Sequence, residues 1–201
     1  MPRIRLKICG IASLEEARLA VAAGADAVGL DPAAFASGAV GDPADLAAIS
    51  LALPPTVTPV LLTIALTAGA IAQQVDATAA TAVQIVRPLD LSEYPGLKRI
   101  IRGRKIIQTI WIEDDGAADL AASYAEFADA LLLYPAIADP TELCRQIATV
   151  SPLPVFLHVT GHRQLAALRQ DIRPFAFDIT APRKGAKFDE EGLERLMASL
   201  A

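Results

Sequence analysis

The sequence alternates between two kinds of segment along its whole length. Short apolar runs rich in β-branched residues occur at residues 3–9, 27–31, 57–65, 82–86, 105–112, 130–135, 155–159 and 175–179. Amphipathic, alanine-rich segments lie at Leu14–Ala23, Pro43–Ala52, Ala70–Ala77, Ala117–Phe127, Pro140–Thr149, His162–Gln170 and Asp189–Ser199. The first kind predicts buried strands and the second predicts helices. Only residues 87–101, which contain two prolines and a glycine, are weak as a helix.

Such an alternation is typical of two α/β architectures, a closed (β/α)8 TIM barrel and a doubly wound open sheet. No Gly-x-Gly-x-x-Gly motif follows any of the strand candidates, which disfavours a dinucleotide-binding sheet. We therefore predict the barrel, near the lower size limit for this fold at 201 residues. No linker or change of composition divides the chain, so residues 1–201 are predicted to form a single domain.

The composition limits the partners of the protein. Hydrophobic residues make up 53% and charged residues 20%, which excludes a disordered chain. A net charge of −5 without a basic run argues against a nucleic-acid surface, and no apolar stretch is long enough to span a bilayer. Two cysteines and the lack of a signal-peptide pattern predict a cytoplasmic protein. The expected partner is a small molecule, with or without a phosphate group, and the mean hydropathy of +0.40 suits a monomer or a homodimer.

The first strand candidate carries an unusual pair of polar residues, Lys7 and Cys9. They share a face because side chains alternate along a strand, and we expect that face to point into the barrel. A buried ammonium needs a counter-charge, and Asp178 is the only charged residue on the strand that closes the barrel against the first. We predict a Lys7–Asp178 ion pair, interpreted first as a packing and register device. In the functional interpretation, the nearby cation favours the thiolate of Cys9.

The stretch "LKICGIASLEEARLAVAAGADAVGL" resembles the opening of the phosphoribosylanthranilate isomerase family, (β/α)8 enzymes of tryptophan biosynthesis. Weaker similarity is found in "AVQI", "ADALLL" and "GAKFD". The resemblance implies an Amadori rearrangement, an aldose–ketose isomerisation that needs no cofactor. In that reaction a cysteine, here Cys9, removes a proton from the ribose carbon, and an aspartic acid protonates the ring oxygen.

The sequence departs from the family at several positions of the site. Tyr134 occupies the place of the acid at the end of the sixth strand, and Ala39 lies nearest the arginine that binds the anthranilate carboxylate. The family has glycine-rich phosphate turns after the seventh and eighth strands. Here at most one glycine, Gly161, is kept after the seventh strand, and Thr180, Ala181 and Pro182 replace the turn after the eighth. These changes indicate a diverged member of the family. The basic residues that could compensate by charge are Arg163, Arg183 and Lys184.

The mouth of the predicted barrel contains further titratable groups. His158 and His162 lie at the end of the seventh strand, and Asp31 ends the second. His158 could replace the missing acid, or could be a packed barrel residue; both interpretations stay open. No metal is expected, because the acidic residues and histidines lack ligand spacing. The predicted catalytic residues are Cys9, Tyr134 and His158, and the predicted substrate-binding residues are Lys7, Asp31, Gly161, Arg163, Asp178, Thr180 and Arg183.

Three functions are compatible with these residues. The favoured hypothesis is an isomerase-like barrel, a diverged paralogue that uses Cys9 as a base on a sugar phosphate or related small molecule. The alternative is a non-catalytic barrel that binds a ligand or a partner protein and keeps the lysine and cysteine for folding. A phosphoribosylanthranilate isomerase with displaced site residues ranks third.

Overall fold

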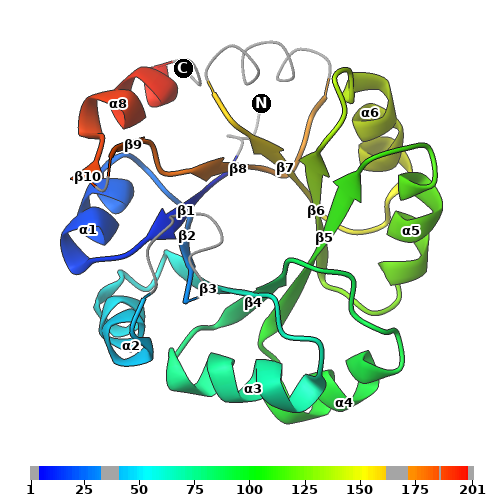
Figure 1. The fold of residues 1–201 in the computed structure, drawn as a ribbon, viewed down its shortest axis with the longest axis horizontal. Coiled ribbons are helices and arrows are strands. Elements are labelled where there is room, and N and C mark those ends of the chain that lie inside the picture. The colour runs from blue at the N-terminus through cyan, green and yellow to red at the C-terminus, as the bar shows by residue number, and fades with distance from the viewer. Residues whose placement is uncertain (1–4, 33–40, 162–171, 186, 199–201) are drawn as a thin grey trace.

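A closed barrel of eight parallel strands forms the centre of the protein (Figure 1). The computed structural model describes residues 5–32, 41–161, 172–185 and 187–198. Each strand pairs with the next, and the last pairs with the first, which confirms the (β/α)8 TIM barrel and excludes the open sheet. The strands are β1 (Arg5–Ile11), β2 (Ala27–Leu30), β3 (Thr58–Thr63), β4 (Ala82–Ile85), β5 (Lys105–Ile112), β6 (Ala130–Pro135), β7 (Val155–Val159) and β8 (Ala176–Thr180).

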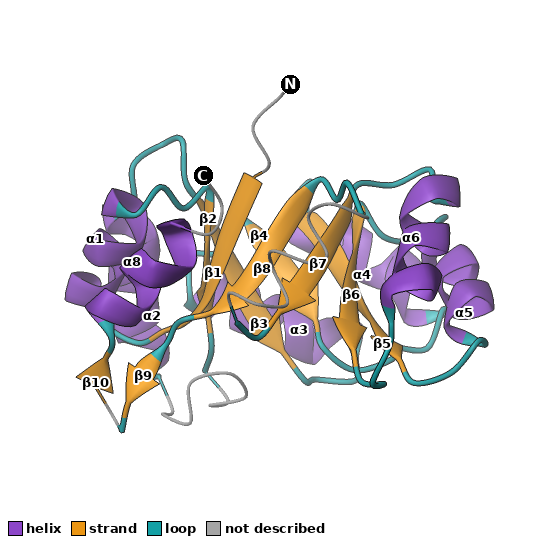
Figure 2. Ribbon diagram, turned by 90° about the horizontal axis from the view of Figure 1, so that it is seen from above, coloured by secondary structure: helices purple, strands orange, loops and turns teal. Residues whose placement is uncertain are grey.

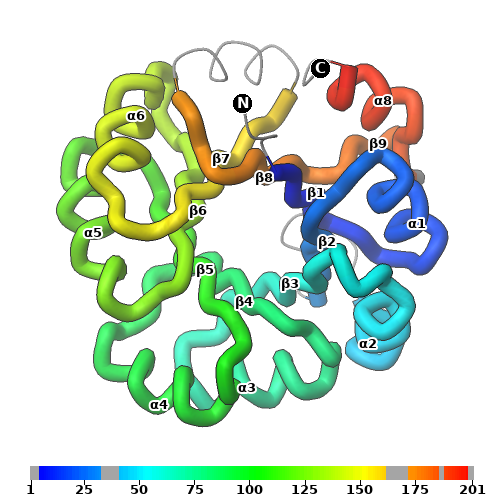
Figure 3. The backbone as a smooth tube through the Cα atoms, turned by 180° about the vertical axis from the view of Figure 1, so that it is seen from behind, coloured from blue at the N-terminus to red at the C-terminus, as the bar shows by residue number. Residues whose placement is uncertain are grey.

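Helices surround the barrel on its outside, as the views along its axis show (Figures 1 and 3). The strands point the same way in Figure 2, with their amino-terminal ends uppermost and a short hairpin, β9–β10, at the lower end. The predicted helix at His162–Gln170 lies outside the described residues. The described helices and the hairpin strands are α1 (Leu14–Ala22), α2 (Pro43–Ala52), α3 (Ala68–Ala77), α4 (Glu93–Ile101), α5 (Ala117–Tyr124), α6 (Thr141–Val150), α8 (Glu190–Ala198), β9 (Arg183–Lys184) and β10 (Lys187–Phe188).

Side-chain caps begin the first two helices. The Ser13 hydroxyl accepts a hydrogen bond from the Glu16 amide at 3.2 Å, and the Asp42 carboxylate accepts one from Ala44 at 2.8 Å. Each cap satisfies an amide that has no partner within the helix. Pro43 follows Asp42 as the first helical residue, where its missing N–H costs nothing.

Helix α4 forms where the sequence pattern is weak. Pro95 falls in its first turn, where a missing N–H breaks no intrahelical hydrogen bond. Tyr94, Leu97 and Ile101 are buried along one face of the helix. Burial of this face outweighs poor propensity, so the expectation of a weak helix was wrong.

The pairing of β1 aligns the residues that matter most for the site. Lys7 stands opposite Asp178 in the β1–β8 register, and Ile8 packs outward into the core between strands and helices. A side chain at Gly29 of β2 would place its Cβ 2.5 Å from the Cys9 sulfur. Glycine at this position therefore makes the room in which Cys9 turns into the barrel. None of the helices in the described ranges is long and apolar enough to cross a membrane.

Candidate functional site

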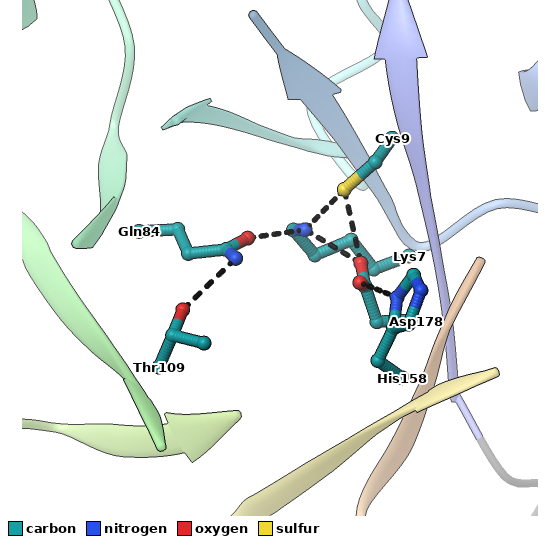
Figure 4. Close-up of polar contacts among 6 residues, drawn as sticks. All are labelled: Lys7, Cys9, Gln84, Thr109, His158 and Asp178. Carbon is teal, nitrogen blue, oxygen red and sulfur yellow. Dashed lines mark hydrogen bonds and ion pairs between the residues drawn. The ribbon is translucent and has the colours of Figure 1, made fainter. Parts of the chain in front are cut away.

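Lys7 lies at the centre of a polar cluster inside the barrel (Figure 4). Its side chain is fully buried, and its Nζ donates to Asp178 Oδ1 at 2.6 Å and to Gln84 Oε1 at 2.7 Å. Nζ also contacts the Cys9 sulfur. Burial opposes the charge of Lys7, but Asp178 and Cys9 raise its pKa above the ordinary value. The predicted Lys7–Asp178 ion pair is confirmed.

Asp178 connects the members of this cluster through its two oxygens. Oδ1 accepts hydrogen bonds from Lys7 and from the Cys9 thiol, the latter at 3.0 Å. Oδ2 lies 2.8 Å from His158 Nδ1. Burial acts to raise the pKa of Asp178, but the charge of Lys7 and the hydrogen bond from His158 hold it well below its usual range. The carboxylate is therefore ionised at neutral pH and links the ammonium, the thiol and the imidazole.

Cys9 is a neutral thiol in this arrangement. It is 2% exposed, and burial together with the facing carboxylate of Asp178 raises its pKa well above the usual range. Lys7 acts in the opposite direction but does not compensate. Lys7 thus favours the thiolate as predicted, but burial and the Asp178 carboxylate, which pairs with Lys7 and faces the sulfur itself, outweigh its effect.

Three rings form a wall beside the cluster. His158 and Tyr134 are stacked, with centroids 4.3 Å apart and planes at 11°, and Trp111 packs on the other side of Tyr134 at 4.3 Å. The Trp111 indole N–H donates to the Val86 carbonyl at 2.9 Å. Burial, and then Asp178, raise the pKa of Tyr134, so this phenol is a still weaker acid than a free tyrosine.

His158 has a hydrogen-bond partner for one of its two ring nitrogens among the described residues. Because Asp178 is ionised and can only accept, Nδ1, the nitrogen that faces it, is the donor of this hydrogen bond. The ring is 4% exposed. Both interpretations of His158 fit this geometry, since the stacked and hydrogen-bonded ring is packed as well as oriented for proton transfer.

The other predicted site residues are placed differently. Asp31 is buried directly after β2, and Thr180 stands opposite Cys9 in the β1–β8 register. At Gly161, a side chain would meet no atom of the described residues other than its chain neighbours within 4 Å. Arg163 lies outside the described residues, as does Ala39.

Arg183 is engaged with the protein itself. Its guanidinium donates to Glu16 of α1 at 3.0 Å and to the Gly10 carbonyl at 2.6 Å, and its side chain is 13% exposed. The contacts tie the segment after β8 to the end of β1. A substrate-binding role would require this ion pair to open.

Two members of the cluster were not among the predicted site residues. Gln84 accepts from Lys7 and donates from Nε2 to Thr109 Oγ1 at 3.1 Å, which extends the polar row across the barrel (Figure 4). Gln84 is the only polar residue of β4, and its inward position in the alternation was the available signal.

The fold and the cluster define a class of protein, a (β/α)8 barrel with linked titratable groups between the middle and the carboxyl ends of its strands. Enzymes of this fold assemble their active sites at the carboxyl ends. Among curated proteins, an N-(5'-phosphoribosyl)anthranilate isomerase from Methanocella arvoryzae is 30% identical over 188 residues, covering 87% of this chain and 86% of that protein. The chain belongs to the phosphoribosylanthranilate isomerase family. No family model matches the sequence.

Solved structures agree with this assignment. The phosphoribosyl anthranilate isomerase from Thermotoga maritima has a TM-score of 0.81 and 24% identity, with 98% of each chain covered. A phosphoribosyl anthranilate isomerase in complex with reduced 1-(o-carboxyphenylamino)-1-deoxyribulose 5-phosphate has a TM-score of 0.79 and 25% identity over the same shares. The fold and its closure are those of the family.

Proposed function

We propose that the protein is an aldose–ketose isomerase that transfers protons on an amino sugar phosphate or a related small molecule, with Cys9 as the base and His158 as the acid. A single observation carries this proposal: the Asp178 carboxylate contacts both groups, the thiol at 3.0 Å and the imidazole at 2.8 Å. Cys9 occupies the position of the family base. Tyr134, in the place of the family acid, is too weak an acid for this role, and the imidazole of His158 takes it over.

The reaction requires a proton to leave one group of the cluster and another group to supply one. Cys9 must lose its proton to accept one from the sugar carbon, and His158 must be protonated to donate one to the ring oxygen. A protonated His158 places positive charge beside Asp178, which weakens the negative field that disfavours the Cys9 thiolate. Thiolate and imidazolium therefore stabilise one another across Asp178.

The first compound to test as a substrate is the one after which the relatives are named. N-(5'-phosphoribosyl)anthranilate is offered to the purified protein, and the loss of its fluorescence is followed beside a panel of other amino sugar phosphates. Turnover of the anthranilate compound supports a phosphoribosylanthranilate isomerase. Turnover of another member alone supports a diverged paralogue, for which the replacements at Tyr134 and Thr180 argue.

Variants decide whether the proposed groups act. Cys9→Ala and His158→Asn are each expected to lower kcat by at least about 100-fold, as is typical for loss of a general acid or base. The Asn side chain keeps a donor for Asp178, so the ion pair survives. Cys144→Ala serves as the control, because Cys144 is buried in the outer core away from the cluster. Activity that is unchanged in Cys9→Ala would overturn the assignment of the base.

A non-catalytic ligand-binding barrel is the second candidate, favoured by the burial and raised pKa of Cys9. Alkylation of Cys9 in a Cys144→Ala background separates the two. Reaction in the folded protein near neutral pH, slowed by a sugar phosphate, supports the enzyme. A thiol that reacts only on unfolding, together with no turnover of any compound, supports the binding barrel.

A further inference from the structure

The amino-terminal end of the barrel is hollow. A cavity of about 630 Å³ opens there, at the end opposite the polar cluster and uppermost in Figure 2. Four alanines from alternate strands line it: Ala27 of β2, Ala82 of β4, Ala130 of β6 and Ala176 of β8. Barrel interiors are usually filled at each layer by four bulky branched side chains from alternate strands. Here the layer is made of methyl groups, and the missing volume is the cavity.

The inner wall of the cavity is apolar and partly aromatic. Val60 and Ile107 form its floor together with the alanines. Phe156 and Phe175 form one side, with ring centroids 5.6 Å apart and planes at 55°. Phe175 is 40% exposed, so part of its ring remains open to solvent. A cavity of this size, apolar with a few polar groups at its rim, has the properties of a small-molecule site.

Charged side chains at the rim indicate the sign of the ligand. Lys105 forms an ion pair with Asp129 at 3.0 Å. The Asp129 carboxylate also accepts a hydrogen bond from the Ile106 amide, and the Asp26 carboxylate accepts one from the Leu6 amide. Arg5 lies with its guanidinium 4.4 Å from the centroid of Phe175 and, within the described ranges, forms no ion pair with an acid. The N–H donors of the Arg5 guanidinium therefore lie beside the aromatic wall of the cavity.

We infer that this end of the barrel binds an aromatic monocarboxylate, with the ring in the cavity against Phe156 and the carboxylate on Arg5. A planar ring matches the aromatic wall, and a guanidinium matches a carboxylate bidentately. This site lies at the opposite end of the barrel from the proposed acid and base, and it does not depend on the reaction assigned to them.

The test uses 1-naphthoate as the probe, with binding measured by its fluorescence and by calorimetry on the intact protein. The neutral isostere 1-naphthamide reports the apolar contribution. We expect saturable binding of 1-naphthoate and binding of the amide that is about tenfold weaker, the value of one charge-assisted contact. Equal affinity for the two probes would overturn the anionic class, and no saturable binding would overturn the site.

Two variants locate the bound probe. Ala82→Leu fills the cavity and is expected to weaken 1-naphthoate binding by at least about 30-fold, more than the charge contact alone contributes. Arg5→Gln is expected to lower affinity for 1-naphthoate about tenfold and leave 1-naphthamide within twofold. Arg145→Gln, on exposed α6, is the charge-matched control. If Ala82→Leu fails to fold, Ala176→Val replaces it, and binding that is unaffected by a folded filling variant rejects this location.

Discussion

The two halves of the barrel interior are built from the same strands and filled in opposite ways. Toward the carboxyl ends, Lys7, Asp178, Cys9, His158 and Gln84 form one connected polar cluster. Toward the amino ends, four alanines leave a cavity of about 630 Å³. Each half departs from the branched apolar packing that a barrel of this kind uses for stability. Burial of charged groups lowers the stability of one half, and loss of apolar packing around the cavity lowers the stability of the other.

Removing the central cation should have the largest effect. Lys7→Met keeps the length of the side chain but leaves Asp178 buried without its ion-pair partner. We expect the free energy of unfolding to fall by about 3–5 kcal/mol, the cost of breaking a buried pair. Urea denaturation followed by circular dichroism measures it.

An exposed pair is the control for this result. Lys105→Met breaks the ion pair with Asp129, in which the lysine side chain is 70% exposed, and should cost no more than about 1 kcal/mol. Losses of similar size in the two variants would show that the polar half contributes no more than ordinary surface charge.

The close approach of β2 to β1 predicts the second effect. Gly29→Ala would place a Cβ 2.5 Å from the Cys9 sulfur and 2.9 Å from its Cα. Since the backbone as well as the side chain is in the way, we expect a loss of about 1–3 kcal/mol. Thermal unfolding measures it, and Gly69→Ala, where no atom lies within 4 Å, provides a matched control. Rescue of Gly29→Ala by Cys9→Ala should be incomplete, and full rescue would contradict the backbone contact.

Acid should destabilise the protein by protonating Asp178 in the polar half. The pKa of Asp178 is lowered in the folded state by Lys7 and His158 against the effect of burial. Its contribution is therefore present above the unfolded value near 4 and is lost as pH falls below it. We expect a loss on the order of 1–2 kcal/mol from this group between about pH 5 and pH 3.

The variant Asp178→Asn tests how much of the acid sensitivity comes from Asp178. We expect this variant to be less stable at neutral pH, but its free energy of unfolding should change less between pH 5 and pH 3 than that of the unmodified protein. Parallel acid limbs in the two proteins would assign the pH dependence to other carboxyl groups.

The sequence was enough to predict the barrel and the ion pair in its polar half, but not all the contacts that decide the chemistry of that half. The alternation of strands and helices was enough for the barrel, and an ammonium on a buried strand required Asp178 as its partner. The alternation also places Gln84 inward, so that its membership of the cluster could have been predicted. Two features depend on side-chain directions that the alternation leaves open: the contact of Asp178 with Cys9 and the stacking of Tyr134 on His158. The four alanines of the other half can be read in the sequence, but only the strand register shows that they lie at the same end of the barrel.

Filling the cavity should have the smallest effect and the opposite sign. Ala82 is 3% exposed at the cavity wall, so Ala82→Leu adds apolar contacts without displacing a polar group. We expect a gain of about 1 kcal/mol in the free energy of unfolding, within the range of cavity-filling substitutions. Ala20→Leu is the matched control, because Ala20 is fully buried in the outer core and does not line the cavity, so that it should destabilise through overpacking. A loss in both variants would mean that the alanine layer is already close-packed, and the contrast between the two halves would then reduce to the polar cluster alone.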